Sequence, residues 1–137
     1  MKIAIERAGL TQVEELASMN KQLISDEGHA NPMNIEQLTE RMRGWLLGEY
    51  AAYMATVDGE IAGYCLFRDE GSYVYIRHLF VQEKYRQRGI GKALVNWLNE
   101  NIWHGQKMRI DVLCNNLNGI EFWHKIGFVD YCITMER

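Results

Sequence analysis

Two hydrophobic periodicities follow one another along this chain. Short runs of apolar, aromatic and β-branched residues predict strands, and these runs are KIAIERA, EYAAYMATV, IAGYCLF, SYVYIRHLFV, KMRIDVLC and FVDYCITMER. Segments in which apolar residues recur every three or four positions predict helices, and they cover residues 11–23, 34–46, 91–103 and 117–126. The predicted order of elements is therefore βααβββαβαβ.

Turn and capping residues indicate how these elements join. Thr11 and Asn34 each precede a Glu or Gln by three positions, which is the spacing of a capping box at a helix start. Asp58-Gly59 is a strong hairpin signal between two of the strands. A helix crossover from the strand at 73–81 to the strand at 107–114 would make that pair parallel. We therefore expect an α/β fold, with helices on both faces of a mixed, mostly antiparallel sheet.

Composition excludes several classes of function. A chain of 137 residues with 47% hydrophobic residues is expected to form one domain, over 1–137, with a substantial core. A net charge of -3 and a pI of about 5.8 argue against a nucleic-acid partner. No apolar run approaches a membrane span and the start does not resemble a signal peptide, so we expect no membrane partner and a cytoplasmic location. The histidines and cysteines lack metal-ligand spacing, so we expect no metal.

The segment VQEKYRQRGIGKAL, residues 81–94, concentrates positive charge in a chain that is acidic overall. Four basic residues lie within 84–92, and two glycines flank Ile90 where a strand should give way to a helix. Unpaired backbone N–H groups at the positive end of a helix dipole form a ready anion site. Gly89 and Gly91 carry no Cβ, so we expect phosphate oxygens to approach the backbone there. We therefore expect this segment to bind a pyrophosphate group.

Two familiar phosphate motifs do not match this segment. A P-loop needs a glycine where Arg86 stands and a serine or threonine where Ala93 stands. A Rossmann fingerprint needs a third glycine where Leu94 stands, and it normally opens the first βαβ unit of a chain. The sequence instead has the pattern Arg/Gln-x-x-Gly-x-Gly/Ala after an apolar strand, at Arg86–Gly91.

In this form HLFVQEKYRQRGIGKALVNWL resembles the acetyl-CoA-binding motif of the GNAT N-acetyltransferase superfamily. NNLNGIEFWHKIGF, residues 115–128, is similar to the second signature of that family. The spacing of the two signatures and the order of elements match as well, so the resemblance covers nearly the whole chain. It implies a GNAT fold, with a sheet splayed between the strands at 73–81 and 107–114.

The resemblance also implies where acetyl-CoA would bind as co-substrate. Backbone groups of Leu79 and Val81 would pair with pantetheine, and an N–H of Leu79 or Phe80 would polarise the thioester carbonyl. Asn116 and Gly119 would lie at the cofactor, and Trp123 would pack beside its thiol end. The pyrophosphate would be held by the turn, whose residues are Arg86, Gln87, Arg88, Gly89, Ile90, Gly91 and Lys92.

The resemblance leaves the acid and the base of the reaction open. Many family members have a tyrosine where Trp123 stands, and an indole cannot protonate the leaving thiolate. Tyr131 is a candidate substitute, and solvent protonation is the alternative. His78, next to the expected oxyanion site, is a candidate general base. A bulge in its strand, which is common in the family, would change the face on which Arg77 lies.

The acceptor side is expected in the loop between the first two helices. Asp26, Glu27 and His29 lie there, and acidic groups would suit a cationic amine. The resemblance implies transfer of an acetyl group from acetyl-CoA to a primary amine of a small molecule, by direct attack through a tetrahedral intermediate. A weakly catalytic acyl-CoA-binding regulatory module, and an enzyme that acetylates protein N-termini or lysines, are the alternatives. A homodimer is possible, as relatives are often dimeric.

Overall fold

A computed structural model describes residues 2–28 and 31–137 of the chain. Its strands form one sheet in the order β1-β2-β3-β4-β5, antiparallel except for the parallel pair β4 and β5. The strands are β1 (Ile3–Arg7), β2 (Tyr50–Val57), β3 (Glu60–Asp69), β4 (Val74–Val81) and β5 (Met108–Ile110). The expected α/β fold with a mixed, mostly antiparallel sheet is confirmed.

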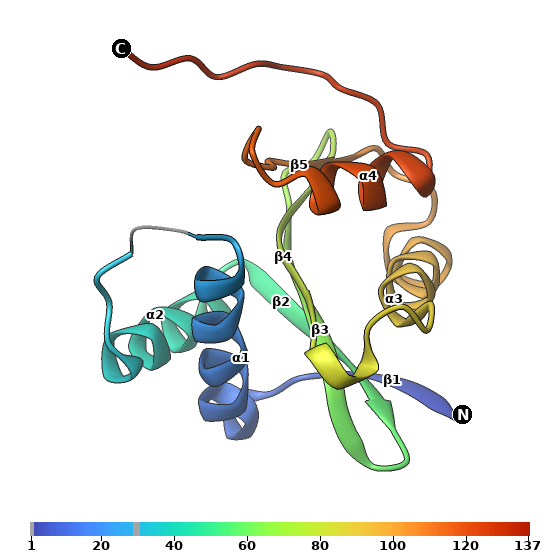
Figure 1. Ribbon diagram of the computed structural model, residues 1–137. Coiled ribbons are helices and arrows are strands. Elements are labelled where there is room, and N and C mark those ends of the chain that lie inside the picture. Colours follow the sequence, from blue (N-terminus) through green and yellow to red (C-terminus); the bar gives the residue numbers. More distant parts are fainter. Residues whose placement is uncertain (1, 29–30) are drawn as a thin grey trace.

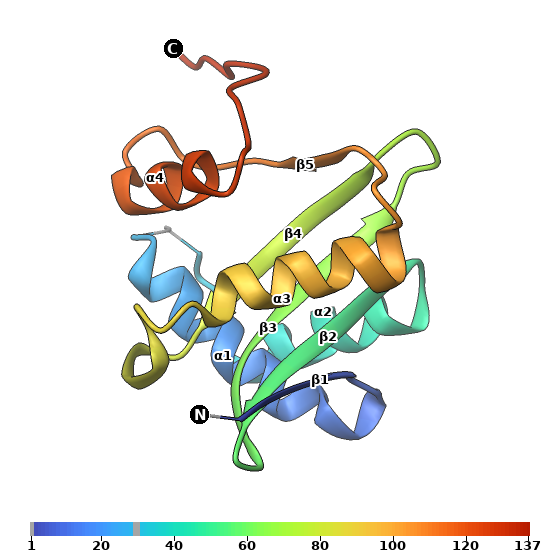
Figure 2. The ribbon, with the colours of Figure 1, turned by 90° about the vertical axis from the view of Figure 1, so that its right-hand side faces the viewer.

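Helices cover both faces of this sheet (Figures 1 and 2). Helices α1 (Val13–Asp26) and α2 (Ile35–Leu47) lie against one face, and α3 (Ile90–Leu98) and α4 (Leu117–Lys125) lie on the other. Short 3-10 turns, η1 (Leu10–Gln12) and η2 (Glu83–Tyr85), precede α1 and α3, and a π-helical turn, η3 (Asn99–Trp103), extends α3. Side chains of opposite parity along each strand supply two separate cores.

The structure confirms one of the two predicted helix caps and the predicted hairpin turn, and it contradicts the other cap. The capping box of α2 is confirmed, because Asn34 and Gln37 exchange backbone and side-chain hydrogen bonds of 2.9 Å. The predicted cap at Thr11 is wrong. That residue lies inside η1, and Gln12 instead accepts a 2.7 Å bond from the N–H of Gly9. Asp58 and Gly59 form the expected tight turn, with φ of 50° and 84°.

A β-bulge in the middle of β4 reverses the direction of its side chains. Leu66 is paired with His78 while the next residue of β3 is paired with Ile76, so Arg77 is the extra residue. Before the bulge, Ile76 packs into the core under α3, whereas after it Phe80 packs under α1 and α2. The bulge considered from the sequence is therefore present, and it turns Arg77 and His78 toward the α1–α2 face.

The strand predicted over FVDYCITMER is wrong. Residues 128–137 form no strand, and beyond Phe128 the described residues show no backbone–backbone hydrogen bond from this segment. The chain instead leaves the end of α4 and runs away from the sheet (Figures 1 and 2). A strand exists only where a neighbouring edge pairs with it, so an alternating pattern alone does not make one.

Candidate functional site

The sheet splits where β4 continues past β5. The two parallel strands pair only over Val74–Ile76 and Met108–Ile110. The remaining residues of β4, from Arg77 to Val81, have β3 on one side and no strand on the other within the described chain. The expected splay is confirmed, and it leaves β4 beyond Ile76 without a strand on that edge, where an extended ligand can add as a strand. The carbonyl of Val81 is already engaged there by the side chain of Arg86.

The turn after β4 has a row of backbone amides without a protein acceptor in the described part of the chain. Gln87 and Gly89 adopt positive φ of 62° and 78°, and Gly89 is the N-cap of α3. In the described part of the chain, the amides of residues 87–92 donate to no protein acceptor, and the first partnered amide after them is that of Ala93. Consecutive unpaired N–H groups at a helix start concentrate positive potential for an anion. Arg88 and Lys92 are exposed beside them.

The two glycines of this turn have different reasons to be glycine. At Gly89 a Cβ would meet nothing within 4 Å, so its positive φ is what favours glycine. A Cβ at Gly91 would lie 3.3 Å from Cζ of Phe122 on α4. Gly91 is therefore needed for packing between α3 and α4. The expectation that phosphate oxygens approach the backbone at Gly91 stays a prediction.

Arg86 holds the turn in place through two partners. Its Nε donates to the carbonyl of Val81 at 2.7 Å, and its Nη2 donates to Oδ2 of Asp26 at 2.6 Å. Burial opposes ionisation of Asp26, but the hydrogen bonds from Arg86 and Gln22 outweigh it and lower the pKa of this carboxyl. The predicted cofactor residue Arg86 and the predicted acceptor residue Asp26 are thus engaged with each other.

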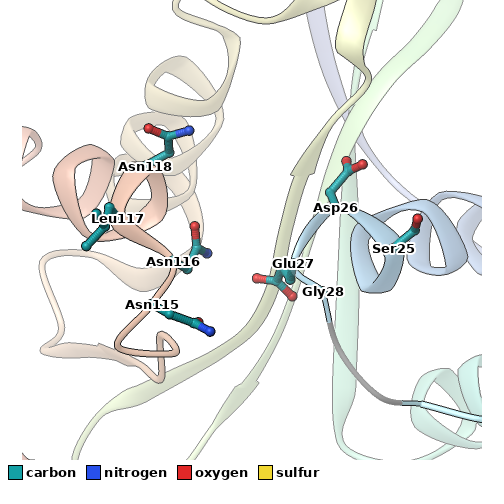
Figure 3. A pocket seen from close by; sticks show the side chains of 8 residues that line it. All are labelled: Ser25, Asp26, Glu27, Gly28, Asn115, Asn116, Leu117 and Asn118. Atoms are coloured by element: carbon teal, nitrogen blue, oxygen red, sulfur yellow. The ribbon is translucent and has the colours of Figure 1, made fainter.

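A cavity of about 490 Å³ lies between the end of α1 and the start of α4, with the ribbon of β4 passing between them (Figure 3). The α1 side contributes Asp26 and Glu27, and the α4 side contributes Asn116. Figure 3 shows the carboxylate of Glu27 pointing toward the Asn115–Asn116 loop. The structure therefore brings residues predicted for acceptor and cofactor binding, ninety positions apart in the sequence, to one cavity. His29 lies outside the described residues.

Asn116 and Gly119 form one structural unit at the start of α4. The side chain of Asn116 caps the helix by accepting a 3.1 Å hydrogen bond from the N–H of Gly119. A Cβ on Gly119 would lie only 2.5 Å from Nδ2 of Asn116. The spacing Asn-x-x-Gly in the second signature is therefore a helix cap, which fixes the Asn116 amide at the edge of the cavity.

His78 is half-buried among aromatic neighbours on the α1–α2 face. Its Nδ1 lies 3.0 Å from the hydroxyl of Tyr64, and the Trp45 ring meets it edge-on. Burial, together with the charges of Arg41 and Arg77, lowers the pKa of His78 to about 3. Burial also raises the pKa of Tyr64, and the charge of Glu27 adds to that rise. His78 is thus a neutral hydrogen-bonding partner of Tyr64, which argues against the general-base role expected for it.

Two other candidate residues lie away from the cavity. Trp123 is only 6% exposed and packs edge-on against Phe122 and Phe128 in the α3–α4 core. Tyr131 is 77% exposed on the segment after α4, where it contacts Arg109 of β5. The cavity borders the opposite end of α4. This placement argues against Tyr131 as a proton donor within its own chain.

An arginine cluster beside His78 could not be predicted from the sequence. The guanidinium carbons of Arg41 and Arg77 lie 4.5 and 4.7 Å from the centre of the Trp45 ring. Arg41 also donates to Asn20 at 3.0 Å. Only the bulge in β4 brings Arg77 to this face, so periodicity could not reveal the cluster. Within the described residues no group of three or more metal-ligating side chains occurs, and no helix is long and apolar enough to span a membrane.

Comparison with known proteins agrees with this geometry. The model of the acetyltransferase (GNAT) family matches residues 13–128. An N-alpha-acetyltransferase of Sulfurisphaera tokodaii is 27% identical over 139 aligned positions, which cover 90% of this chain and 78% of that protein. The resemblance of the two sequence signatures to this family is thereby confirmed.

Solved structures share the fold. A possible acetyltransferase from Clostridium difficile 630 superposes with a TM-score of 0.83 at 19% identity, covering 100% of this chain and 97% of that one. AAC(6')-Iy, an aminoglycoside N-acetyltransferase solved with the bisubstrate analogue CoA-S-monomethyl-acetylneamine, has a TM-score of 0.80 at 19% identity, covering 100% and 98%.

Proposed function

The chain belongs to the GNAT acetyltransferase family, and we propose that it transfers the acetyl group of acetyl-CoA to a primary amine of a small molecule. The observation that carries this proposal is the row of unpaired amides over residues 87–92, directly beyond the unpaired edge of β4. An elongated ligand with a pyrophosphate at one end and amides along its arm matches both features.

Residues of this chain that fit acetyl-CoA form a continuous path. The amides from Gln87 to Lys92 would hold the pyrophosphate, with Arg88 and Lys92 as exposed counter-charges. The strand-free edge at Leu79–Val81 would pair with the pantetheine arm through groups other than the Val81 carbonyl, which accepts from Arg86. The side-chain amide of Asn116, held by its cap to Gly119, would face the arm from across the cavity. An N–H of Leu79 or Phe80 would then stabilise negative charge that develops on the carbonyl oxygen.

We assign Glu27 to recognition of the amine in its charged form. Its carboxylate borders the cavity and points toward the Asn115–Asn116 loop across it. The amine must lose a proton before it attacks. Because His78 has a pKa of about 3, it has little affinity for that proton at neutral pH. We therefore propose that the proton leaves to solvent through the open cavity.

Thiolate release needs no dedicated acid from this chain. Trp123 is buried in the core, and Tyr131 is exposed on the segment beyond α4. A thiol of ordinary pKa, near 8.5, is a tolerable leaving group at neutral pH, and water can protonate it afterwards. We propose solvent protonation, so that catalysis rests on positioning and on stabilisation of the developing oxyanion.

A second candidate acceptor is a protein N-terminus. The observation in its favour is the 27% identity to a protein named N-alpha-acetyltransferase. The acetyltransferase solved with an acetylneamine analogue supports the small-molecule acceptor instead. A third possibility, a module that binds acyl-CoA without turnover, is motivated by the tryptophan at position 123.

Calorimetry with CoA and a thiol-release assay separate these three functions. Titration of CoA should release heat, and a panel of small primary amines should give turnover with acetyl-CoA, faster than N-terminal peptides do. Faster acetylation of peptides would transfer the assignment to the protein N-terminus. Binding of CoA without turnover on any acceptor would support the binding module. Absence of CoA binding would refute all three.

A further inference from the structure

Two arginines from distant segments meet at one tryptophan on the α1–α2 face of the sheet. Arg41 comes from α2 and Arg77 from the bulge in β4, and both guanidinium groups lie within 5 Å of the centre of the Trp45 ring, at 4.5 and 4.7 Å. Arg77 is exposed and Arg41 is half-buried, so the site they form is open to solvent on one side. We call Arg41 and Arg77 the arginine pair.

Neither member of the arginine pair has an acidic partner in the described part of the chain. Arg86 illustrates the usual arrangement, since it forms an ion pair with a carboxylate, but no ion pair of the described residues involves Arg41 or Arg77. Asp111, just beyond β5, instead accepts a 3.0 Å hydrogen bond from the hydroxyl of Tyr75. Two positive charges therefore lie close together without a counter-charge.

The hydrogen bonds of the arginine pair leave most of its donors unused. Arg41 donates from Nη2 to Oδ1 of Asn20 at 3.0 Å, and its buried Nε has no acceptor among the described residues. Arg77 donates from Nη1 to the hydroxyl of Tyr50 over 3.4 Å, which is long for a hydrogen bond. A guanidinium carries five N–H donors in a planar fork. Both side chains thus keep donors for further acceptor oxygens.

The surroundings of the arginine pair favour a negative charge. Burial lowers the pKa of Arg41, and the charge of Arg77 lowers it further. Burial also lowers the pKa of His78, and both arginine charges add to that effect. Charges of one sign that disfavour each other in this way are stabilised when an anion binds between them.

The arginine pair lies beside the proposed reaction centre. Arg77 is two residues before Leu79, whose N–H would polarise the thioester carbonyl, and two residues of a strand span about 7 Å. On the other side, the pair lies near the proposed amine site at Glu27. Burial raises the pKa of Tyr64, the charge of Arg41 lowers it and that of Glu27 raises it, so both charges act on the same hydroxyl.

We propose that Arg41 and Arg77 bind a carboxylate of the acceptor, which makes the acceptor an amino acid or a derivative that keeps its carboxylate. The inference rests on the proposed acetyl transfer and names the substrate class for that site. The guanidinium fork matches the two oxygens of a carboxylate. Glu27 would hold the ammonium form of the amine while the arginine pair holds the carboxylate, so a zwitterion complements both charges.

Matched sets of acceptors test this proposal with acetyl-CoA. Each set contains an amino acid, its amide and the amine that lacks the carboxyl group, for example phenylalanine, phenylalaninamide and phenethylamine. Further sets are built on glycine, leucine and lysine. In the best set, we expect kcat/KM to be about 10- to 100-fold higher for the amino acid than for its amide, the range typical of charge-assisted hydrogen bonds.

Substitutions of arginine by glutamine identify the residues that recognise the carboxylate. Arg77→Gln should bring the ratio of kcat/KM for acid and amide close to one, because it removes the exposed member of the pair. Arg43→Gln is the matched control, since it removes the same charge from α2 at a residue that is paired with Glu40. That variant should keep the preference for the acid.

Calorimetry gives a second measurement that needs no turnover. The N-acetylated amino acid and its N-acetylated amide are titrated into the protein saturated with CoA. The acid should bind about 10-fold or more tightly than the amide, and Arg77→Gln should remove the difference. If no acceptor is turned over but this difference is found, the proposed acetyl transfer fails and the carboxylate site stands.

The other outcomes contradict the proposal. Equal kcat/KM for acid and amide in every set would reject the carboxylate site and leave acetyl transfer standing. A preference for the amides would point to a protein N-terminus, where a peptide bond replaces the carboxylate. A larger preference for phosphoethanolamine over ethanolamine than for any acid over its amide would assign the pair to a phosphate. If Arg77→Gln lowers the rates for all acceptors alike together with thermal stability, the pair only holds α2 against β4.

Discussion

The side chain of Arg86 joins the carboxylate of Asp26 at 2.6 Å, across 60 positions of sequence. The contact ties the turn that we propose to hold the pyrophosphate to the end of α1, which borders the cavity. The pair is partly exposed, with side-chain exposures of 40% and 30%. Its contribution to overall stability is therefore modest, about 1 kcal/mol or less. Its larger effect is to hold the turn and the acceptor side in one relative position.

Arg86→Gln should weaken CoA binding about 10-fold while leaving thermal stability nearly unchanged, because the turn loses its link to Asp26 and to the Val81 carbonyl. Isothermal titration with CoA measures the affinity. Lys84→Gln, which removes the neighbouring Lys84–Glu60 pair at 2.6 Å, is the matched control. An equal loss of affinity in both variants would show only a general effect of charge.

The Arg86–Asp26 pair also predicts how CoA affinity depends on pH. The pKa of Asp26 is lowered in the folded chain, so the contribution of the pair is present above the ordinary carboxyl range and is lost as pH falls through the lowered pKa. CoA affinity between pH 6 and 8 should therefore have the same pH dependence in the unsubstituted chain and in Asp26→Asn. Such a transition would mean that this carboxyl titrates near neutrality.

Replacement of Gly89 by alanine should chiefly lower CoA affinity, whereas replacement of Gly91 should chiefly lower stability. Gly89→Ala forces a side chain into positive φ at an exposed site, which costs about 1 kcal/mol and disturbs the amide row. CoA affinity should fall about 10-fold. Gly91→Ala presses on Phe122 and should cost about 1–3 kcal/mol of stability with a smaller effect on affinity. Calorimetry measures the CoA affinity and thermal melts measure the stability. A larger loss of affinity in Gly91→Ala than in Gly89→Ala would contradict these roles.

His78 should make the folded chain sensitive to acid. Its folded pKa of about 3 lies below the usual 6.5, so protonation favours unfolding, and stability falls as pH drops below about 6.5. The loss between pH 8 and pH 5 is about 2 kcal/mol. His78→Gln should flatten this dependence in denaturant titrations at several pH values. Its kcat should keep the wild-type pH profile from 6 to 8; a profile that changes shape would restore His78 as the base.

Glu27→Gln should raise the KM for a cationic amine about 10-fold with little change in CoA affinity, because the charge that faces the cavity is removed. Steady-state kinetics with the best amine of the panel measure this split. Glu14→Gln, in the exposed first turn of α1, is the control of equal charge change. Equal effects of the two substitutions would refute a local role for Glu27.

The sequence by itself determined the order of the elements as far as α4, the two signature segments and the hairpin at Asp58-Gly59, but it predicted one strand too many after α4. These features depend on local chemistry, namely side-chain periodicity, glycine at positive φ and capping residues close in the chain. The turn over residues 87–92 is local in this sense, so its unpaired amides could be predicted from glycine spacing alone.

Only the tertiary structure decided the rest. One extra residue in β4 sets the face of Arg77 and His78, because the side-chain period of a strand is two and a bulge reverses it. The partner of Asp26, the pKa of His78 and the packing of Gly91 against Phe122 each depend on segments far apart in the chain. Residues 128–137 have the alternating sequence of a strand but form none, since a strand needs an edge that its own sequence cannot supply.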